Sequence, residues 1–151
     1  MKSKAIIISA VAAVAVIGGL VATHELAEDI AVAPAQLPQQ VQAFVSTNFP
    51  GQNILYAQKD LDWFTWKYDV FLADGTEINF DTSNEWDKIN TQMRAVPTQL
   101  IPAPVAATLT ANFPAVVVTK IDKESWGYEV ELANGLELKF NKQGAIKEMD
   151  D

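Results

Sequence analysis

The chain contains one sequence unit twice, and this duplication limits the folds that it can adopt. The segment that starts at Leu37 matches the segment that starts at Ile101, and each contains the tripeptide Asn-Phe-Pro. The segment that starts at Trp66 then matches the segment that starts at Trp126, with Trp, Tyr, Val, Leu, Ala, Gly, Glu and Phe at equivalent positions. The first copy has the longer connection between its matched segments. Two such copies predict two equivalent units that share one core.

Each copy begins with a predicted helix and continues with predicted strands. Pro38 and Pro102 stand where a helix can begin, and apolar residues follow at helical spacing. Asn-Phe-Pro ends each helix, because the residue before a proline is driven out of the helical region. Alternating apolar residues then predict three or four strands in each copy. They lie at 54–58, 65–72 and 76–80 in the first copy, with 86–89 as the optional fourth, and at 116–121, 127–132, 136–140 and 145–149 in the second.

The register of the central hairpin follows from its apolar residues. An Asp-Gly or Asn-Gly pair allows a two-residue turn, which would put Val70 and Ile78 on opposite faces. A three-residue loop with a left-handed glycine pairs them instead and makes one face wholly apolar. We therefore predict positive φ at Gly75 and Gly135. The predicted core contains Tyr68, Val70, Leu72, Phe80, Tyr128, Val130, Leu132 and Phe140, with Trp66 and Trp126 beside them and Phe49 and Phe113 from the helices.

These elements predict an α+β fold. Two tandem helix-plus-antiparallel-meander repeats form one antiparallel sheet, with both helices on its apolar face and the other face open to water. The predicted organisation is a signal peptide at 1–22, a linker at 23–36, one repeat at 37–99 and a second at 100–151. Two lysines precede the N-terminal apolar run, as in a signal peptide. The run is long for that role, so an uncleaved N-terminal anchor stays open.

Composition excludes several classes of function. The 151 residues contain no cysteine, one histidine, 11 Lys+Arg and 19 Asp+Glu, for a formal net charge of −8. No disulfide, Cys-zinc site or thiol nucleophile can therefore form, and the acidic charge argues against a nucleic-acid partner. The only histidine, His24, lies in the predicted linker, where it cannot complete a catalytic or metal-binding set.

Catalytic and metal chemistry have little support elsewhere in the sequence. Residues 81–85 carry several oxygen ligands, but the equivalent residues 141–145 keep the turn without them. We therefore predict a turn, with a calcium site as the weaker alternative. Carboxylates on an open sheet face also lack the burial that tunes an acid–base pair. No catalytic residue, cofactor or metal is predicted.

The two copies resemble a known family. The motifs are P-x-x-V at the helix start, N-F-P at its end, and Y-x-V-x-L-x-[DN]-G-x-E-[IL]-x-F-[DN] on the hairpin. This pattern resembles the PepSY-like, beta-lactamase-inhibitor-like domains of exported bacterial proteins, over residues 37–151. The resemblance implies tandem helix-plus-sheet units, a periplasmic or secreted location, and a non-enzymatic protein-binding or inhibitory module. No inhibitor contact is carried over, because the matching residues are those that build the fold.

Two features of the sequence are candidates for partner binding. Trp63 and Phe64 lie in a predicted loop at 60–64 that the second copy lacks; they either cover the open end of the core or anchor a partner. The predicted register sets Glu131 opposite Glu137, a destabilising pair that either is screened by water and salt or receives a Lys or Arg from a partner. The same register sets Glu129 opposite Lys139 and Lys67 opposite Asp81. The candidate partner-binding residues are Trp63, Phe64, Phe71, Glu129, Glu131 and Glu137.

The sequence thus predicts an exported, non-catalytic module that binds an unknown protein or peptide, of basic character, on an open acidic sheet face and an aromatic loop. Inhibition of an enzyme by this module stays open. The alternative is a scaffold domain of the cell envelope with no specific ligand, and a hydrolase is the weaker third hypothesis. No membrane span is predicted unless the N-terminal segment is retained.

Overall fold

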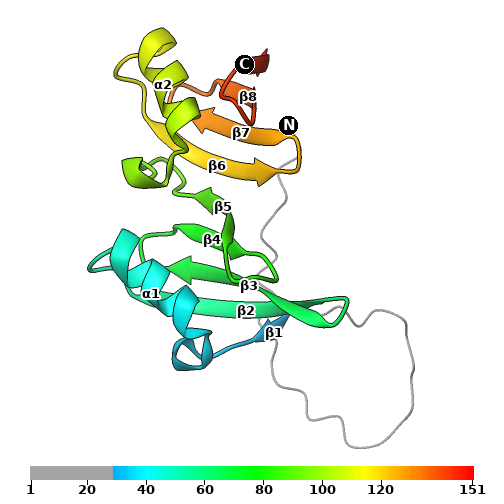
Figure 1. The fold of residues 1–151 in the computed structure, drawn as a ribbon. Coiled ribbons are helices and arrows are strands. Elements are labelled where there is room, and N and C mark those ends of the chain that lie inside the picture. Colours follow the sequence, from blue (N-terminus) through cyan, green and yellow to red (C-terminus); the bar gives the residue numbers. More distant parts are fainter. Residues whose placement is uncertain (1–28) are drawn as a thin grey trace, which may run out of the picture.

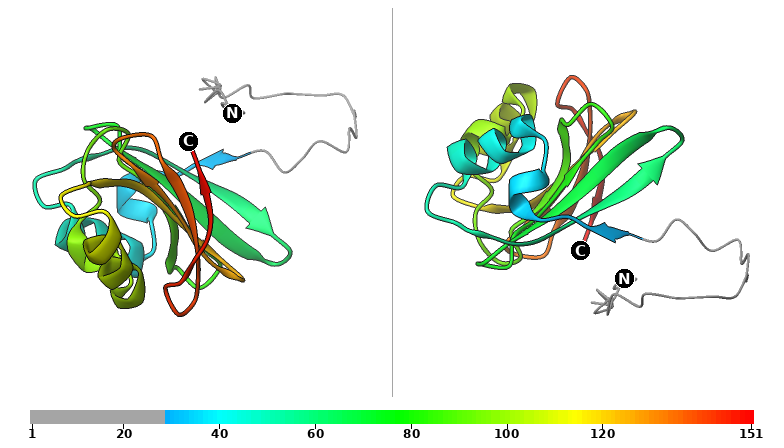
Figure 2. Two further views of the ribbon diagram at one scale, coloured as in Figure 1. Left: turned by 90° about the horizontal axis from the view of Figure 1, so that it is seen from above. Right: turned by 90° about the horizontal axis from the view of Figure 1, so that it is seen from below.

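The computed structural model describes residues 29–151 and contains one nine-stranded antiparallel sheet with two α-helices on one of its faces (Figures 1 and 2). The strands lie side by side in chain order, from β1 at one edge to β9 at the other. This confirms the predicted α+β class. The predicted signal peptide lies outside the described residues. The elements are β1 (Ile30–Ala31), the 3-10 helix η1 (Pro34–Gln36), α1 (Gln39–Asn48), β2 (Ile54–Asp62), β3 (Thr65–Leu72), β4 (Glu77–Phe80), β5 (Trp86–Asn90), the 3-10 helix η2 (Thr98–Leu100), α2 (Ala103–Asn112), β6 (Val118–Glu124), β7 (Gly127–Leu132), β8 (Glu137–Asn141) and β9 (Ile146–Asp150).

Both α-helices begin and end where the sequence predicts. Pro38 and Pro102 are the N-cap residues of α1 and α2. Phe49 and Phe113 are the C-caps, with φ of −128° and −133°, and each precedes a proline. The helix ends are therefore set locally, by the steric effect of proline on the residue before it.

The central hairpins have the predicted bulged register. Gly75 and Gly135 have φ of 91° and 90°. Val70 lies opposite Ile78, and the equivalent residues of β7 and β8 are paired in the same way. The two-residue alternative is wrong in both hairpins, because it would move half of these apolar side chains to the open face.

One buried apolar cluster runs along the sheet from β2 to β8, as predicted. Ile89 and Ile121 lie opposite each other in β5 and β6, have no exposed surface, and carry the cluster across the middle of the sheet. Tyr68 and Tyr128 are only partly buried and pack against its margin. The predicted core residues that are buried are Phe49, Val70, Leu72, Phe80, Val130, Leu132 and Phe140, with Phe113 partly buried.

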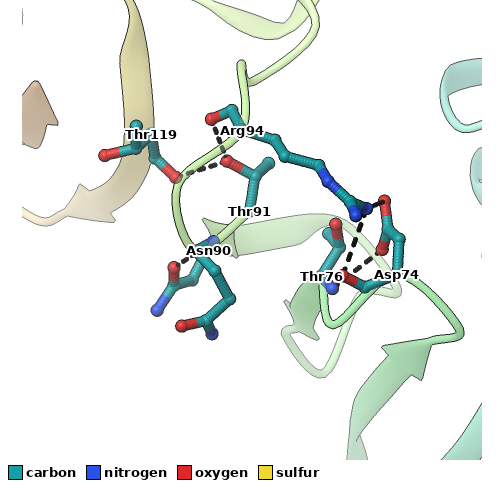
Figure 3. A network of polar contacts seen from close by, with 7 residues as sticks. Asp74, Thr76, Asn90, Thr91, Arg94 and Thr119 are labelled. Carbon is teal, nitrogen blue, oxygen red and sulfur yellow. Dashed lines mark hydrogen bonds and ion pairs between the residues drawn. The ribbon is translucent and has the colours of Figure 1, made fainter. Parts of the chain in front are cut away.

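A polar network links the β3–β4 turn to the segment between β5 and α2 (Figure 3). Arg94 Nη1 lies 2.9 Å from Asp74 Oδ2 and donates to the Asp74 carbonyl at 3.1 Å. Asp74 Oδ1 also accepts from the Thr76 N–H at 2.9 Å. On the other side, Thr91 Oγ1 donates to the Thr119 carbonyl in β6 at 2.8 Å. These contacts hold the segment that leads from the first half of the sheet to the second.

Replacing Asp74 by Asn tests this network through its pH dependence. Burial alone would raise the pKa of Asp74, but hydrogen bonds from Thr76 and Arg94 outweigh it and leave that pKa below its ordinary value. Because folding lowers this pKa, the stabilisation is present above the unfolded pKa and is lost as the pH falls through the folded one. We expect Asp74→Asn to cost about 1 kcal/mol at neutral pH and less at about pH 3. Urea unfolding at both pH values measures this, and an equal loss at both would contradict it.

The tip of the β2–β3 hairpin differs from the prediction. In place of the predicted loop at 60–64, β2 continues through Asp62, which pairs with Thr65. Trp63 and Phe64 form the two-residue turn between them, with φ of 58° at Trp63. The extra residues of the first half therefore lengthen two paired strands, and the hairpin extends past β4 (Figure 1).

The predicted burial of Trp66 and Trp126 is wrong. The β6–β7 hairpin is shorter, so Trp126 falls in its turn and is 45% exposed. Trp66 lies further from its own turn, opposite Leu61, and is half-buried. The Lys59 ammonium lies 4.1 Å from the centre of the Trp66 ring. The two tryptophans match in sequence, but the unequal hairpins place them differently.

Part of the predicted linker at 23–36 is ordered against the sheet. Ile30 and Ala31 form β1, which pairs with two residues of β2. Val32 follows and packs against the core. The sheet therefore gains an edge strand that the sequence does not predict.

Candidate functional site

The sheet face opposite the helices, called the open face below, is lined by polar and charged side chains. Strand pairing places these side chains in rows that cross the sheet, and acidic residues outnumber basic ones in both central rows. The first row contains Phe71, Glu77, Asn90, Lys120, Glu131, Glu137 and Asp150. The second contains Asp69, Asn79, Lys88, Asp122, Glu129, Lys139 and Glu148.

Lysines compensate part of this charge. Lys120 Nζ lies 3.2 Å from Asp122 Oδ2. Burial alone would lower the pKa of Lys120, but the carboxylates of Asp122, Glu129 and Glu131 together raise it. This lysine is therefore held in its charged form by acidic groups on β6 and β7.

Three carboxylates, Glu131, Glu137 and Asp150, lie side by side on β7, β8 and β9. No lysine or arginine lies between them in this row. Glu131 lies opposite Glu137, as predicted, and Glu137 lies opposite Asp150. In the neighbouring row, Lys139 lies between two glutamates and its Nζ is 3.0 Å from Glu148 Oε2. Directly opposed side chains are close enough for like charges to destabilise the pairing. This run of acids is the largest departure from charge alternation on the open face.

The open face is hollowed between β2 and β6, in a depression of about 380 Å³. Asp69 is hydrogen-bonded within it by Gln58 Nε2 at 3.1 Å and by Asn79 Nδ2. One buried oxygen each of Asp60, Asn79 and Asp122 has no hydrogen-bond partner among the described residues. The hollow therefore has more acceptors than donors. Its polar lining consists of Asp60, Lys67, Asp69, Asn79, Asp87, Lys88, Asp122, Lys123 and Glu124.

Two carboxylates, Asp87 in the hollow and Glu77 on the open face, have pKa values above their ordinary range. Burial raises the pKa of Asp87, and the charges of Asp81 and Asp69 raise it further, while Lys67 opposes them. Burial likewise raises the pKa of Glu77. A raised pKa means that the environment disfavours the charged form of the carboxyl group, so negative charge on this face is costly in the unbound protein.

The predicted aromatic candidates lie in two different settings. Phe71 is on the open face, where its ring packs against Tyr56 with centroids 5.7 Å apart. Trp63 and Phe64 are 85% and 93% exposed at the hairpin tip, so they do not cover the core as one prediction required. Their exposure leaves the partner-anchor prediction in place.

The structure does not bring all the predicted site residues together. The acidic candidates lie on β7 and β8, toward the β9 edge, whereas the aromatic tip belongs to β2 and β3, near the β1 edge. The β3–β4 pairing keeps the predicted register but ends at Tyr68 and Phe80, one residue short of the predicted Lys67–Asp81 pair. The Lys67 ammonium lies 2.8 Å from Asp62 Oδ2.

The hollow itself was not predicted. Alternation in β3 and β4 places Asp69 and Asn79 on the open face, but the pairing of β5 with β6 is needed to bring Asp122 beside them. Asp87 lies at an irregularity of the β4–β5 pairing, between the paired residues Trp86 and Lys88. Such irregularities change which face a side chain occupies and leave little trace in sequence alternation.

The turn at residues 81–85 has the geometry of a side-chain-capped turn. Asp81 Oδ1 accepts hydrogen bonds from two backbone N–H groups of the turn, at 2.8 and 3.1 Å. Asn141 Oδ1 does the same in the β8–β9 turn, at 3.0 and 2.9 Å. An uncharged amide thus replaces the carboxylate, which favours the turn over the calcium alternative. Within residues 29–151, no group of three or more His, Cys, Asp or Glu is arranged to hold a metal ion.

Within residues 29–151, no helix combines the length and apolar character needed to cross a membrane.

Comparison with curated proteins gives no match. Several solved structures are similar. A putative periplasmic protein from Bacteroides vulgatus is 33% identical, with a TM-score of 0.77 over 82% of this chain and 98% of that chain. A putative periplasmic protein of unknown function from the same organism is 31% identical, with a TM-score of 0.75 over 82% and 100% of the two chains.

A putative calcium-regulated periplasmic protein from Bacteroides thetaiotaomicron is 29% identical, with a TM-score of 0.74 over 82% of this chain and 97% of that chain. The family model described as "putative beta-lactamase-inhibitor-like, PepSY-like" matches residues 24–62 and 66–148. This match includes both helices and nearly all of the sheet. The chain therefore belongs to the PepSY-like, beta-lactamase-inhibitor-like family.

Proposed function

We propose that this protein is an exported, non-catalytic module that binds a basic protein or peptide segment on its open face. The observation that carries the proposal is the run of opposed carboxylates, Glu131, Glu137 and Asp150, on a face that the helices leave uncovered. The similarity to periplasmic proteins and the membership of an inhibitor-like family support export and binding.

Electrostatics explains why the partner is basic. A Lys or Arg placed between Glu131 and Glu137 would replace their repulsion by two attractions. The unpartnered oxygens of Asp60, Asn79 and Asp122 offer further acceptors in the hollow, provided that its side chains move enough to expose them. The acidic field of the face would also speed the approach of a positively charged partner.

The same charges support binding over catalysis. Two carboxylates with raised pKa values, Asp87 and Glu77, belong to a network spread over an open sheet. Networks of this kind shift pKa values without any catalytic role. The only histidine of the chain, His24, precedes the described residues.

The aromatic hairpin tip is the second part of the proposed surface. Strand spacing of about 4.8 Å puts β3 about 19 Å from β7, so one partner that contacts both regions must cross several strands. Trp63 and Phe64 would then anchor one end of that partner, since exposed aromatic residues supply much of the energy of protein interfaces.

A pull-down from the exported fraction tests the proposal. The bait is compared with two variants, Glu131→Gln/Glu137→Gln and Trp63→Ala/Phe64→Ala. We expect a partner with a basic segment that the charge variant recovers poorly and that high salt releases. Equal recovery by the bait and both variants would contradict the proposed surface, and recovery of nothing specific would favour a scaffold without a ligand.

The substitution Glu137→Gln gives a quantitative prediction. Removing one charge of the opposed pair should stabilise the free protein by a few tenths of a kcal/mol, while slowing association with the partner and weakening its salt dependence. Urea unfolding and association rates at low and high salt measure the two effects. The matched control is Glu85→Gln in the exposed β4–β5 turn, which removes the same charge away from the acidic run. Binding kinetics that both variants leave unchanged would make the pair an ordinary solvated feature.

A further inference from the structure

We infer that the partner adds a β-strand to the outer edge of β9, using an extended segment in which Lys or Arg alternates with apolar residues. This inference rests on the proposed function, and it specifies where on the sheet the partner binds and what sequence pattern it has.

The first observation is the edge itself. Among the described residues, β9 pairs only with β8, so the N–H and C=O groups on its outer side have no strand to pair with. It lies at the end of the sheet opposite β1 (Figure 1). Its residues after Ile146 are exposed. An exposed edge of this kind is a template for strand addition, in which backbone hydrogen bonds supply affinity.

The second observation is the chemistry on the two faces of β9. Glu148 and Asp150 lie on the open face, opposite Lys139 and Glu137. Met149 lies on the helix-bearing face, opposite the buried Leu138, and is 51% exposed. Side chains of an added strand would alternate between these faces. The partner would therefore present basic residues beside the carboxylates and an apolar residue over Met149.

The third observation is the charge pattern that reaches this edge. The acidic run on β7, β8 and β9 ends at Asp150, and no described strand follows to supply an opposite charge. A Lys or Arg on an added strand next to Asp150 would supply it. A basic residue next to Glu148 would likewise continue the alternation that Lys139 begins in the neighbouring row.

The same charges disfavour a second copy of this chain as the occupant. Antiparallel pairing of two β9 strands would bring Glu148 and Asp150 of one copy against the same acids of the other. Opposed like charges weaken such pairing, and the net charge of −8 adds to the repulsion. The edge is thus protected against self-association while remaining open to a basic strand.

A synthetic peptide of alternating Lys and Val, blocked at both ends, tests the inference on the full exported chain. One matched peptide has the same composition with all Lys before all Val. Another has the alternating sequence with every second backbone nitrogen methylated, which removes donors without removing charge. We expect the alternating peptide to bind at least tenfold more tightly than both matched peptides. It should also slow hydrogen exchange at the outward-facing N–H groups of β9.

Charge-reversal variants locate the site. Glu148→Lys/Asp150→Lys should weaken binding of the alternating peptide at least tenfold. The control Asp29→Lys/Glu85→Lys makes the same change in net charge at exposed positions away from β9 and outside the lining of the hollow, and it should weaken binding much less. Thermal unfolding of both variants verifies that they are folded. The methylated peptide tests backbone hydrogen bonding to the β9 edge without any substitution in the protein.

The outcomes separate the inference from the proposed function. Equal binding of the alternating and methylated peptides, with no change in β9 exchange, would overturn strand addition and leave binding on the open face intact. Failure of every basic peptide to bind would overturn both. A dimer of the free protein that protects β9 would also overturn the inference, because the occupant would then be a second copy.

Discussion

Replacing Ile121 by Ala is expected to destabilise both halves of the protein together, by about 2–5 kcal/mol. Ile121 has no exposed surface and lies between its cross-strand neighbours Ile89 in β5 and Val130 in β7. Truncation removes buried apolar area and leaves a cavity that the sheet cannot easily close. The cavity would lie where the buried cluster passes from one half of the sheet to the other.

Urea unfolding followed by circular dichroism and by tryptophan fluorescence measures this effect. Trp66 and Trp86 report on the first half and Trp126 on the second. We expect coincident transitions before and after the substitution, because one core contains residues from all the strands between β2 and β8. The control is Val117→Ala, just before β6, where the side chain is 41% exposed and the cost should be below about 0.5 kcal/mol. Separate transitions for the two halves would contradict a shared core.

The parts of this fold that could be predicted are those that short sequence patterns determine. Asn-Phe-Pro ends each helix through local steric restriction, and an apolar face together with one glycine determines each central hairpin. The same local register predicts that Glu131 and Glu137 oppose each other, because they belong to one hairpin. This is why two of the three carboxylates in the acidic run, Glu131 and Glu137, were predictable.

The other residues of the site are placed by strand pairs that contain a register shift, β4–β5 and β8–β9. Asp150 joins the run only after the register shift between β8 and β9, and Asp87 enters the hollow through the shift between β4 and β5. Each shift changes the side-chain alternation that a sequence pattern relies on. The two-residue strand β1 is too short to have an alternation pattern, and the misplaced Trp126 follows from a shorter hairpin. These are effects of tertiary pairing, which the local sequence does not contain.

Replacing Gly144 by Ala is expected to cost about 3 kcal/mol or more, because strain and overlap act together. Gly144 lies in the β8–β9 turn with φ of 84°, a conformation that other residues adopt at a cost of about 1–2 kcal/mol. An added Cβ would lie 2.4 Å from the carbonyl oxygen of Pro104, in the first turn of α2. The Gly144 carbonyl also accepts a hydrogen bond from Thr108 Oγ1 at 2.6 Å. The turn and the helix therefore cannot separate without losing this contact.

Gly135→Ala is the matched control for this prediction. Gly135 has φ of 90°, nearly the same as Gly144, but an added Cβ there would meet no atom within 4 Å. We expect it to cost only the conformational strain, about 1–2 kcal/mol. The difference between the two variants, measured by urea unfolding, isolates the close approach of the β8–β9 turn to α2. Equal costs would mean that α2 moves away from the turn without penalty, and that the helix is packed less tightly on the sheet than its contacts with Gly144 indicate.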